Sequence, residues 1–238
     1  MKFQRVVGVL LSALAISCGG SGAPARDTAA GTKPASPPEN PAPAGVETGP
    51  TLDARRTIVF LGTSLTAGLG LEPDSAYPQQ IQRKIDASGL PYQVVNAGVS
   101  GETTAGLLRR LDWVLKRPAD VIVVETGAND GLRGLPVTAT RSTIGNVLDR
   151  IRRARPDATV LLVQMEAPPN LGQEYTSAFH VMFPELAREH GVTLLPFLLE
   201  GVAGQTTLNQ SDGIHPNNAG ERIVADNVWR MLQPVLKP

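Results

Sequence analysis

Five short apolar runs, separated by longer amphipathic stretches, limit the folds that this chain can adopt. The runs are continuously apolar rather than alternating, which is typical of strands buried on both faces of a sheet. They cover residues 57–61, 92–96, 120–126, 158–164 and 192–197. Strands that alternate with helices favour a parallel sheet covered by helices on both faces. The sequence therefore predicts an α/β fold around a five-stranded parallel sheet.

Two of the intervening stretches show the period of helices that pack on such a sheet. In residues 102–116, four leucines fall on one helical face. Residues 216–235 carry a second apolar stripe, and Pro216 suits its first turn, where a missing backbone N–H is tolerated.

The N-terminal residues predict export. Lys2 and Arg5 precede an apolar run that is too short to span a bilayer as a helix, and small residues lead to Cys18. Residues 1–18 therefore resemble a bacterial lipoprotein signal, in which Cys18 becomes the lipidated first residue of the mature protein. Ala15 stands where leucine is usual, so an ordinary cleaved signal with an incidental cysteine is the alternative. We expect a lipoprotein that faces the periplasm or the cell surface, or otherwise a periplasmic or secreted protein.

Residues 19–50 differ in composition from the rest of the chain. They are rich in Gly, Ala, Ser and Pro and contain no aromatic residue, so they cannot bury enough apolar surface to offset the entropy of ordering. We expect a disordered tether here and one folded domain over residues 51–238. Cys18 is the one cysteine of the chain, so no intrachain disulfide is expected.

Composition argues against a nucleic-acid partner. The 238 residues include 22 basic and 22 acidic side chains, and only 4% are aromatic. Such a chain has neither the basic excess that phosphates require nor a base-stacking surface.

Three polar stretches follow the first three predicted strands, at the edge where open parallel sheets bind ligands. Ser64 lies in the first, "GTSLTAG", and is a candidate nucleophile. A serine hydroxyl needs a neighbouring base that takes its proton. Of the three histidines, His215 has an acidic residue, Asp212, three positions before it, so one turn can present both side chains. Alone, the pair could equally be a capping aspartate and a surface histidine.

The other two stretches offer hydrogen-bond donors for a developing oxyanion. Gly101 of "NAGVSGETT" has no side chain that would obstruct its N–H, and Asn129 of "TGAND" carries a side-chain amide. Each could instead be an ordinary loop residue.

Other chemistries fit the residues less well. The first loop lacks the lysine of a P-loop and the G-x-G-x-x-G spacing of dinucleotide folds. Thr66 occupies the second glycine position of the α/β-hydrolase elbow. No third metal ligand clusters in sequence with Asp212 and His215, so we expect neither metal nor cofactor.

Read together, four blocks in order resemble the SGNH (GDSL) hydrolases, and the resemblance extends over about residues 57–236. The blocks are "GTSL" with Ser64, "SGETT" with Gly101, "GAND" with Asn129 and "DGIHP" with Asp212 and His215. Further segments, such as "GANDGLRGLP", are similar to the bacterial thioesterase I, lysophospholipase L1 and arylesterase branch.

The resemblance implies a flavodoxin-like three-layer sandwich and a metal-free serine mechanism. Ser64 would be the nucleophile and would supply one oxyanion N–H, with Gly101 and Asn129 as the other donors. His215 would be the general base, and Asp212 would orient it. Gly98 is the competing glycine, but the "SGET" match favours Gly101.

The implied substrates are small-molecule or lipid acyl esters, namely aryl esters, acyl thioesters or lysophospholipids, hydrolysed through an acyl-enzyme. A carbohydrate O-acetylesterase and a non-catalytic lipoprotein that binds ligands are the alternatives. Thr63 departs from the family pattern, which has Asp at this position. Because that position transfers no proton, we interpret Thr63 as a tolerated departure.

Overall fold

The computed structural model describes residues 55–238. Five parallel strands form one sheet in the order β2-β1-β3-β4-β5. The strands are β1 (Arg56–Gly62), β2 (Tyr92–Gly98), β3 (Val121–Val124), β4 (Thr159–Gln164) and β5 (Thr193–Phe197). The predicted α/β fold with a five-stranded parallel sheet is confirmed. All five predicted runs contain a strand, although β3 stops before Glu125.

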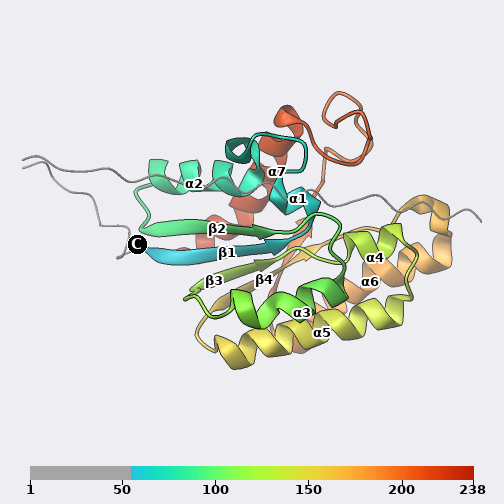
Figure 1. The fold of residues 1–238 in the computed structure, drawn as a ribbon, viewed down its shortest axis with the longest axis horizontal. Coiled ribbons are helices and arrows are strands. Elements are labelled where there is room, and N and C mark those ends of the chain that lie inside the picture. The colour runs from blue at the N-terminus through green and yellow to red at the C-terminus, as the bar shows by residue number, and fades with distance from the viewer. Residues whose placement is uncertain (1–54) are drawn as a thin grey trace, which may run out of the picture. The chain divides into compact units, whose positions relative to one another are not determined.

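Helices cover both faces of this sheet (Figure 1). The long helices are α2 (Tyr77–Ala87), α3 (Thr104–Val114), α5 (Val137–Ala154), α6 (Gln173–His190) and α7 (Asn218–Leu232). Helices α2 and α7 lie on one face, and α3, α5 and α6 lie on the other. The described residues also form three single-turn 3-10 helices: η2 (Pro73–Ser75), η3 (Pro169–Leu171) and η4 (Gln233–Val235). The layers are therefore helix, sheet and helix.

The core explains why the strands are apolar on both sides. Ile58, Val59, Phe60 and Leu61 of β1 are all buried, because successive side chains point into opposite helical layers. On one face, the Phe60 ring meets the ring of Tyr77 of α2 edge-on, with centroids 5.6 Å apart.

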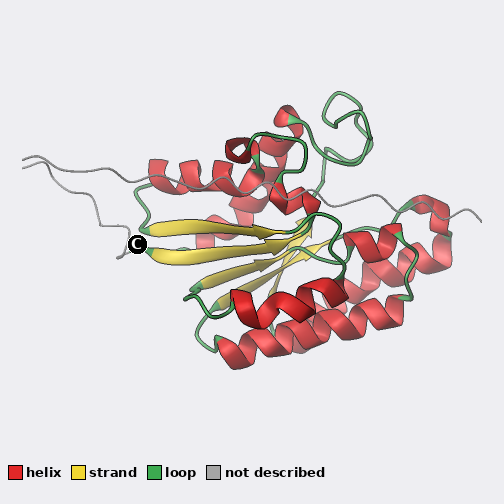
Figure 2. Ribbon diagram, viewed as in Figure 1, coloured by secondary structure: helices red, strands yellow, loops and turns green. Residues whose placement is uncertain are grey.

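The strand order places a ligand site between β1 and β3. From β1 the chain first adds β2 on one side, and then crosses to add β3 on the other. At such a topological switch point the two loops diverge and leave a crevice beyond the carboxyl ends. Two short helices begin there, α1 (Ser64–Ala67) after β1 and α4 (Ala128–Leu132) after β3. In Figure 2 the strand arrowheads point towards this edge.

Two predicted helix boundaries were wrong. Pro216 does not open α7: the helix begins at Asn218, because the Asn217 side chain accepts hydrogen bonds from the N–H groups of Ala219 and Gly220. Pro216 instead forms an antiparallel bridge with Asn209. Helix α3 covers Thr104–Val114 and is shorter than the predicted residues 102–116. Thr103 caps its N-terminus, and Gly101 lies in the loop before it.

Several predictions concern residues outside the described range. The signal peptide over residues 1–18, lipidation at Cys18 and the tether over residues 19–50 all lie there, as do the first four residues of the predicted domain. Across residues 55–238, no helix has both the length and the apolar character needed to cross a membrane.

Candidate active site

Ser64 lies at the sharp junction between β1 and α1. The strand ends at Gly62, where a Cβ atom would overlap the Thr66 side chain and approach Glu125 Oε2 to 2.7 Å. Glycine therefore permits the close packing of this turn. Ser64 is the first residue of α1, so its N–H has no intrahelical acceptor, and its side chain lies at the carboxyl edge of the sheet.

His215 and Asp212 complete a chain of hydrogen bonds that begins at Ser64. The Nε2 atom of His215 lies 2.8 Å from Ser64 Oγ, and its Nδ1 atom lies 2.6 Å from Asp212 Oδ2. The other oxygen, Asp212 Oδ1, accepts the N–H groups of Ile214 at 2.9 Å and His215 at 3.0 Å. The backbone of the loop thus holds the Asp212 carboxylate against the His215 imidazole.

The charge of Asp212 sets the tautomer of His215. The hydrogen bond with the His215 ring, followed by those from the Ile214 and His215 N–H groups, lowers the pKa of Asp212 to about 2. A carboxylate that is charged at neutral pH accepts the Nδ1 proton. The free lone pair of Nε2 then faces the Ser64 hydroxyl, which is the arrangement that a general base requires.

Gly101 lines a pocket that also contains Ser64 and His215. Its φ is +75°, and no atom lies within 4 Å of the position that a Cβ would occupy. Within residues 55–238, no backbone or side-chain acceptor takes its N–H. Gly98 differs, because its N–H donates to Asn96 Oδ1 at 2.9 Å and a Cβ at this position would lie 2.4 Å from the Ala67 backbone nitrogen. Gly101 is thus free to donate to a ligand, whereas Gly98 is engaged in packing.

Asn129 projects from the start of α4 into the pocket. One hydrogen of its Nδ2 amide goes to the Glu102 carbonyl at 3.0 Å, which leaves the second hydrogen for a ligand. Gly127, with φ of +95°, supplies the left-handed turn before α4.

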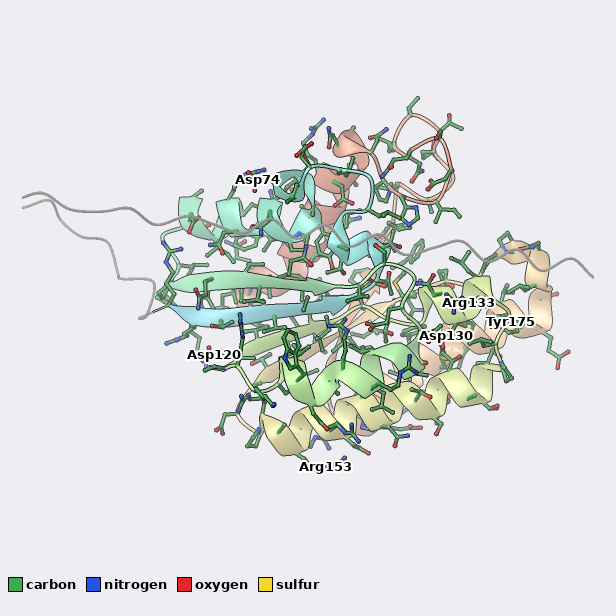
Figure 3. All side chains as sticks on the ribbon, in the orientation of Figure 1. Asp74, Asp120, Asp130, Arg133, Arg153 and Tyr175 are labelled. Carbon is green, nitrogen blue, oxygen red and sulfur yellow. The ribbon has the colours of Figure 1, made fainter. Side chains whose placement is uncertain are left out.

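Five side chains that the sequence did not single out fix the loop around Gly101. Asp130 accepts the Thr104 N–H at 2.9 Å and the Thr104 hydroxyl at 2.7 Å. Arg133 donates to the Gly101 carbonyl at 2.9 Å, and Figure 3 labels both Asp130 and Arg133 beside α4. The Arg110 guanidinium pairs with the Glu102 carboxylate at 2.7 Å and also donates to the Ala97 carbonyl. Most of these hydrogen bonds join residues that are distant in sequence, so the spacing of residues within one motif could not predict them.

The pocket at this site is small and mainly apolar. It measures about 210 Å³ and brings together Ser64, Gly101, Asn129 and His215. Its other lining residues are Thr63, Leu65, Leu69, Ala128, Leu132 and Ile214. A larger cavity of about 700 Å³ lies between β2 and α3, but it contains neither Ser64 nor His215. The chemistry therefore belongs to the smaller pocket.

The other two histidines lie on α6 and pair elsewhere. His180 Nδ1 lies 2.7 Å from Glu166 Oε1, and His190 Nδ1 lies 3.0 Å from Asp149 Oδ1. In the described part of the chain, no third potential metal ligand joins Asp212 and His215.

A parallel three-layer sandwich that joins a serine, a histidine and an aspartate at its switch point defines a class, the serine-dependent hydrolases. Comparison with known proteins narrows that class. Residues 60–223 match the model of the GDSL-like Lipase/Acylhydrolase family, and the chain belongs to this family.

Named relatives cover most of the described domain. Esterase TesA of Pseudomonas aeruginosa is 37% identical over 185 residues, which are 77% of this chain and 90% of that protein. Thioesterase 1/protease 1/lysophospholipase L1 of Escherichia coli K12 is 38% identical over 184 residues, 77% of this chain and 86% of its own length. The arylesterase of Vibrio mimicus is 32% identical over 75% of this chain and 89% of its own.

Solved structures agree with these relatives. A crystal structure of TesA has a TM-score of 0.73 at 36% identity and covers 76% of this chain and all of that one. The psychrotrophic esterase EstA from Pseudoalteromonas, solved with monoethylphosphonate as inhibitor, has a TM-score of 0.71 at 32% identity. It covers 75% of this chain and 97% of its own.

Proposed function

We propose that this protein is a serine esterase or thioesterase that hydrolyses acyl esters through an acyl-enzyme on Ser64. One observation carries the proposal: Ser64 Oγ, the His215 ring and the Asp212 carboxylate are joined by contacts of 2.8 and 2.6 Å. A serine hydroxyl paired with an imidazole whose tautomer is held by a carboxylate is the arrangement that activates serine for acyl transfer.

The steps follow from the positions of these atoms. Ser64 Oγ attacks the acyl carbon while its proton passes to His215 Nε2. The N–H groups of Ser64 and Gly101 and the Asn129 amide donate to the oxyanion that forms. Collapse of this intermediate expels the alcohol or thiol, which takes the proton from His215. A water molecule, deprotonated by His215, then attacks the acyl carbon. The bond to Ser64 Oγ breaks as Oγ takes the proton back from His215, and the carboxylic acid is released.

The lining of the pocket favours acyl chains over sugars. Leu69, Leu132 and Ile214 are 45%, 48% and 44% exposed, although all three are apolar and line the pocket beside Ser64. Exposed apolar side chains around a small cleft gain free energy when an alkyl or aryl group covers them. Sugar recognition would instead need converging polar groups. We propose aryl esters, acyl thioesters and lysophospholipids as the substrate class, in line with the names of the relatives.

An acyl-chain profile of the purified full chain tests this function. We expect hydrolysis of p-nitrophenyl acetate and faster turnover of longer esters such as the octanoate. Turnover of acetate alone would indicate a carbohydrate O-acetylesterase, which acetylated xylan would then identify. If folded protein hydrolyses none of these esters, the alternative of a non-catalytic lipoprotein that binds ligands is supported instead.

We further propose that the protein is exported and anchored by lipid on Cys18. The proposal rests on the charged start, the short apolar run and the small residues before Cys18. Two or more acyl chains are needed for stable anchoring, which a lipoprotein N-terminus provides. Residues 19–50 would then tether the hydrolase domain near the membrane, where lysophospholipid and fatty acyl esters are found.

A further inference from the structure

A buried carboxyl group, which takes no part in the proposed proton transfer, lies directly beneath the nucleophile turn. Glu125 is the residue that follows β3, and it is 0% exposed. Removing a carboxyl group from water is unfavourable unless hydrogen bonds compensate. The partners of Glu125 therefore indicate what the group does.

Among residues 55–238, the donors to Glu125 all come from residues on the two sides of Ser64. The Thr63 N–H donates to Glu125 Oε2 at 2.6 Å, and the Thr63 hydroxyl lies 3.0 Å from both carboxyl oxygens. The Thr66 hydroxyl lies 3.0 Å from Oε2 and 2.8 Å from the Tyr77 hydroxyl. The carboxyl group thus accepts hydrogen bonds from Thr63, the residue before the nucleophile, and from Thr66, two positions after it.

We propose that Glu125 is a positioning residue for catalysis, which sets the direction of the Ser64 hydroxyl and N–H by holding Thr63 and Thr66 in place. The inference rests on the proposed role of Ser64. Because Thr63 is only one peptide away, a small rotation of its N–H would redirect the Ser64 N–H and move Ser64 Oγ relative to His215. Errors of about 1 Å at such a position cost on the order of a hundredfold in rate.

The contact between Thr63 and Glu125 also explains why a threonine fits at position 63. The side chain is 1% exposed and touches both oxygens of Glu125. An aspartate here would put a second carboxyl group against the first, and two such groups cannot both ionise readily. A threonine hydroxyl donates without adding charge. The Thr63 hydroxyl therefore suits a buried carboxyl neighbour.

The decisive variant is Glu125→Met, which keeps the length of the side chain and removes both acceptors. Active-site titration with a fluorophosphonate counts the enzyme molecules that can react. A lower kcat per titrated site therefore reports a change in the geometry of the site, and not a smaller amount of folded protein. We expect kcat to fall about 10- to 100-fold, because the Thr63 N–H and the hydroxyls of Thr63 and Thr66 lose their acceptor together, while KM changes by less than about threefold. Glu125→Gln, which keeps one acceptor oxygen for the Thr63 N–H, should recover most of this loss.

Glu221→Met is the matched control. Glu221 is another buried carboxyl group, 1% exposed, and it accepts a backbone N–H, that of Tyr77 at 2.6 Å, without touching Thr63 or Thr66. Its loss should change the melting temperature and leave kcat per titrated site within about twofold. Equal losses of kcat in the two Met variants, or a Glu125→Met kcat within about twofold of wild type, would overturn the inference.

Two variants of Thr63 keep the test decisive if Glu125→Met does not fold. Thr63→Val removes only the hydroxyl, so kcat should fall about 3- to 10-fold, and Thr63→Ser should lose less than Thr63→Val. An unchanged kcat in Thr63→Val would then count against Glu125. If wild-type protein is not labelled at Ser64, the proposed function fails instead.

Discussion

The Nε2 atom of His215 lies 2.8 Å from Ser64 Oγ, although 151 positions of the chain separate the two residues. Ser64 follows the first strand of the domain, and His215 lies in the last loop before α7. Both loops leave the same edge of the sheet, so tertiary packing alone brings them into hydrogen-bond contact. This contact is the basis of the kinetic predictions below.

Ser64→Ala should abolish the acyl-enzyme. Loss of the nucleophile from a group that acts as a unit lowers kcat by on the order of 10⁴ or more. The measurement is p-nitrophenyl ester turnover together with fluorophosphonate labelling of the wild type and the variant. Equal labelling of both proteins would assign the nucleophile to another residue.

Asn129→Ala should mainly lower kcat. Its amide donates to the Glu102 carbonyl in the free enzyme and has a second hydrogen for the oxyanion, which develops only in the transition state. We expect a loss of about 10²–10³ in kcat with a small change in KM. Asn146→Ala, which removes an exposed amide on α5 outside the pocket, is the control. An effect confined to KM would point to ground-state binding.

Asp212→Asn should lower kcat at every pH at which the enzyme is folded. Because hydrogen bonds lower the pKa of Asp212 to about 2, the wild-type carboxylate is charged from about pH 4 upward. Its stabilising contribution is present above the unfolded pKa of about 3.9 and is lost only as pH falls through about 2. An asparagine has no such charge, and it can hold the wrong imidazole tautomer. We expect a loss of about 10² or more in kcat, and recovery between pH 5 and 9 would contradict the assignment.

Glu221→Gln should gain stability relative to the wild type as the pH rises. Burial is the main cause that raises the pKa of Glu221, to about 8, only partly opposed by the hydrogen bond from the Tyr77 N–H. The folded protein therefore holds a proton that the unfolded chain releases near pH 4.5, so wild-type stability falls between about pH 4.5 and 8. One proton corresponds to a slope of about 1.4 kcal/mol per pH unit. Urea unfolding of both proteins at pH 5, 6.5 and 8 measures the difference, and a difference independent of pH would refute it.

Cys18→Ser should prevent lipid attachment in cells. If Cys18 is the lipidated residue, the wild type will incorporate labelled fatty acid and fractionate with membranes, whereas the variant will do neither. Ser64→Ala is the matched control, because it changes the active site and leaves the N-terminus intact. An unlabelled wild type would indicate an ordinary secretory signal instead.

The sequence by itself determined the sheet and the local parts of the site. Strands of a parallel sheet are buried on both faces, so each is a continuous apolar run that can be recognised without its neighbours. Asp212 and His215 could also be paired in advance, because a turn of three residues is a local structure.

Only the tertiary structure decided how these parts meet. It brought Ser64 to His215. Among the described residues it also distinguished Gly101, whose N–H has no acceptor, from Gly98, whose N–H is bound to Asn96. It also revealed Glu125, which the sequence shows merely as the end of an apolar run. The physical reason is that these relationships depend on loops from different strands converging at one edge of the sheet. Local propensity and periodicity carry no information about distances between such loops, which long-range packing of the core establishes.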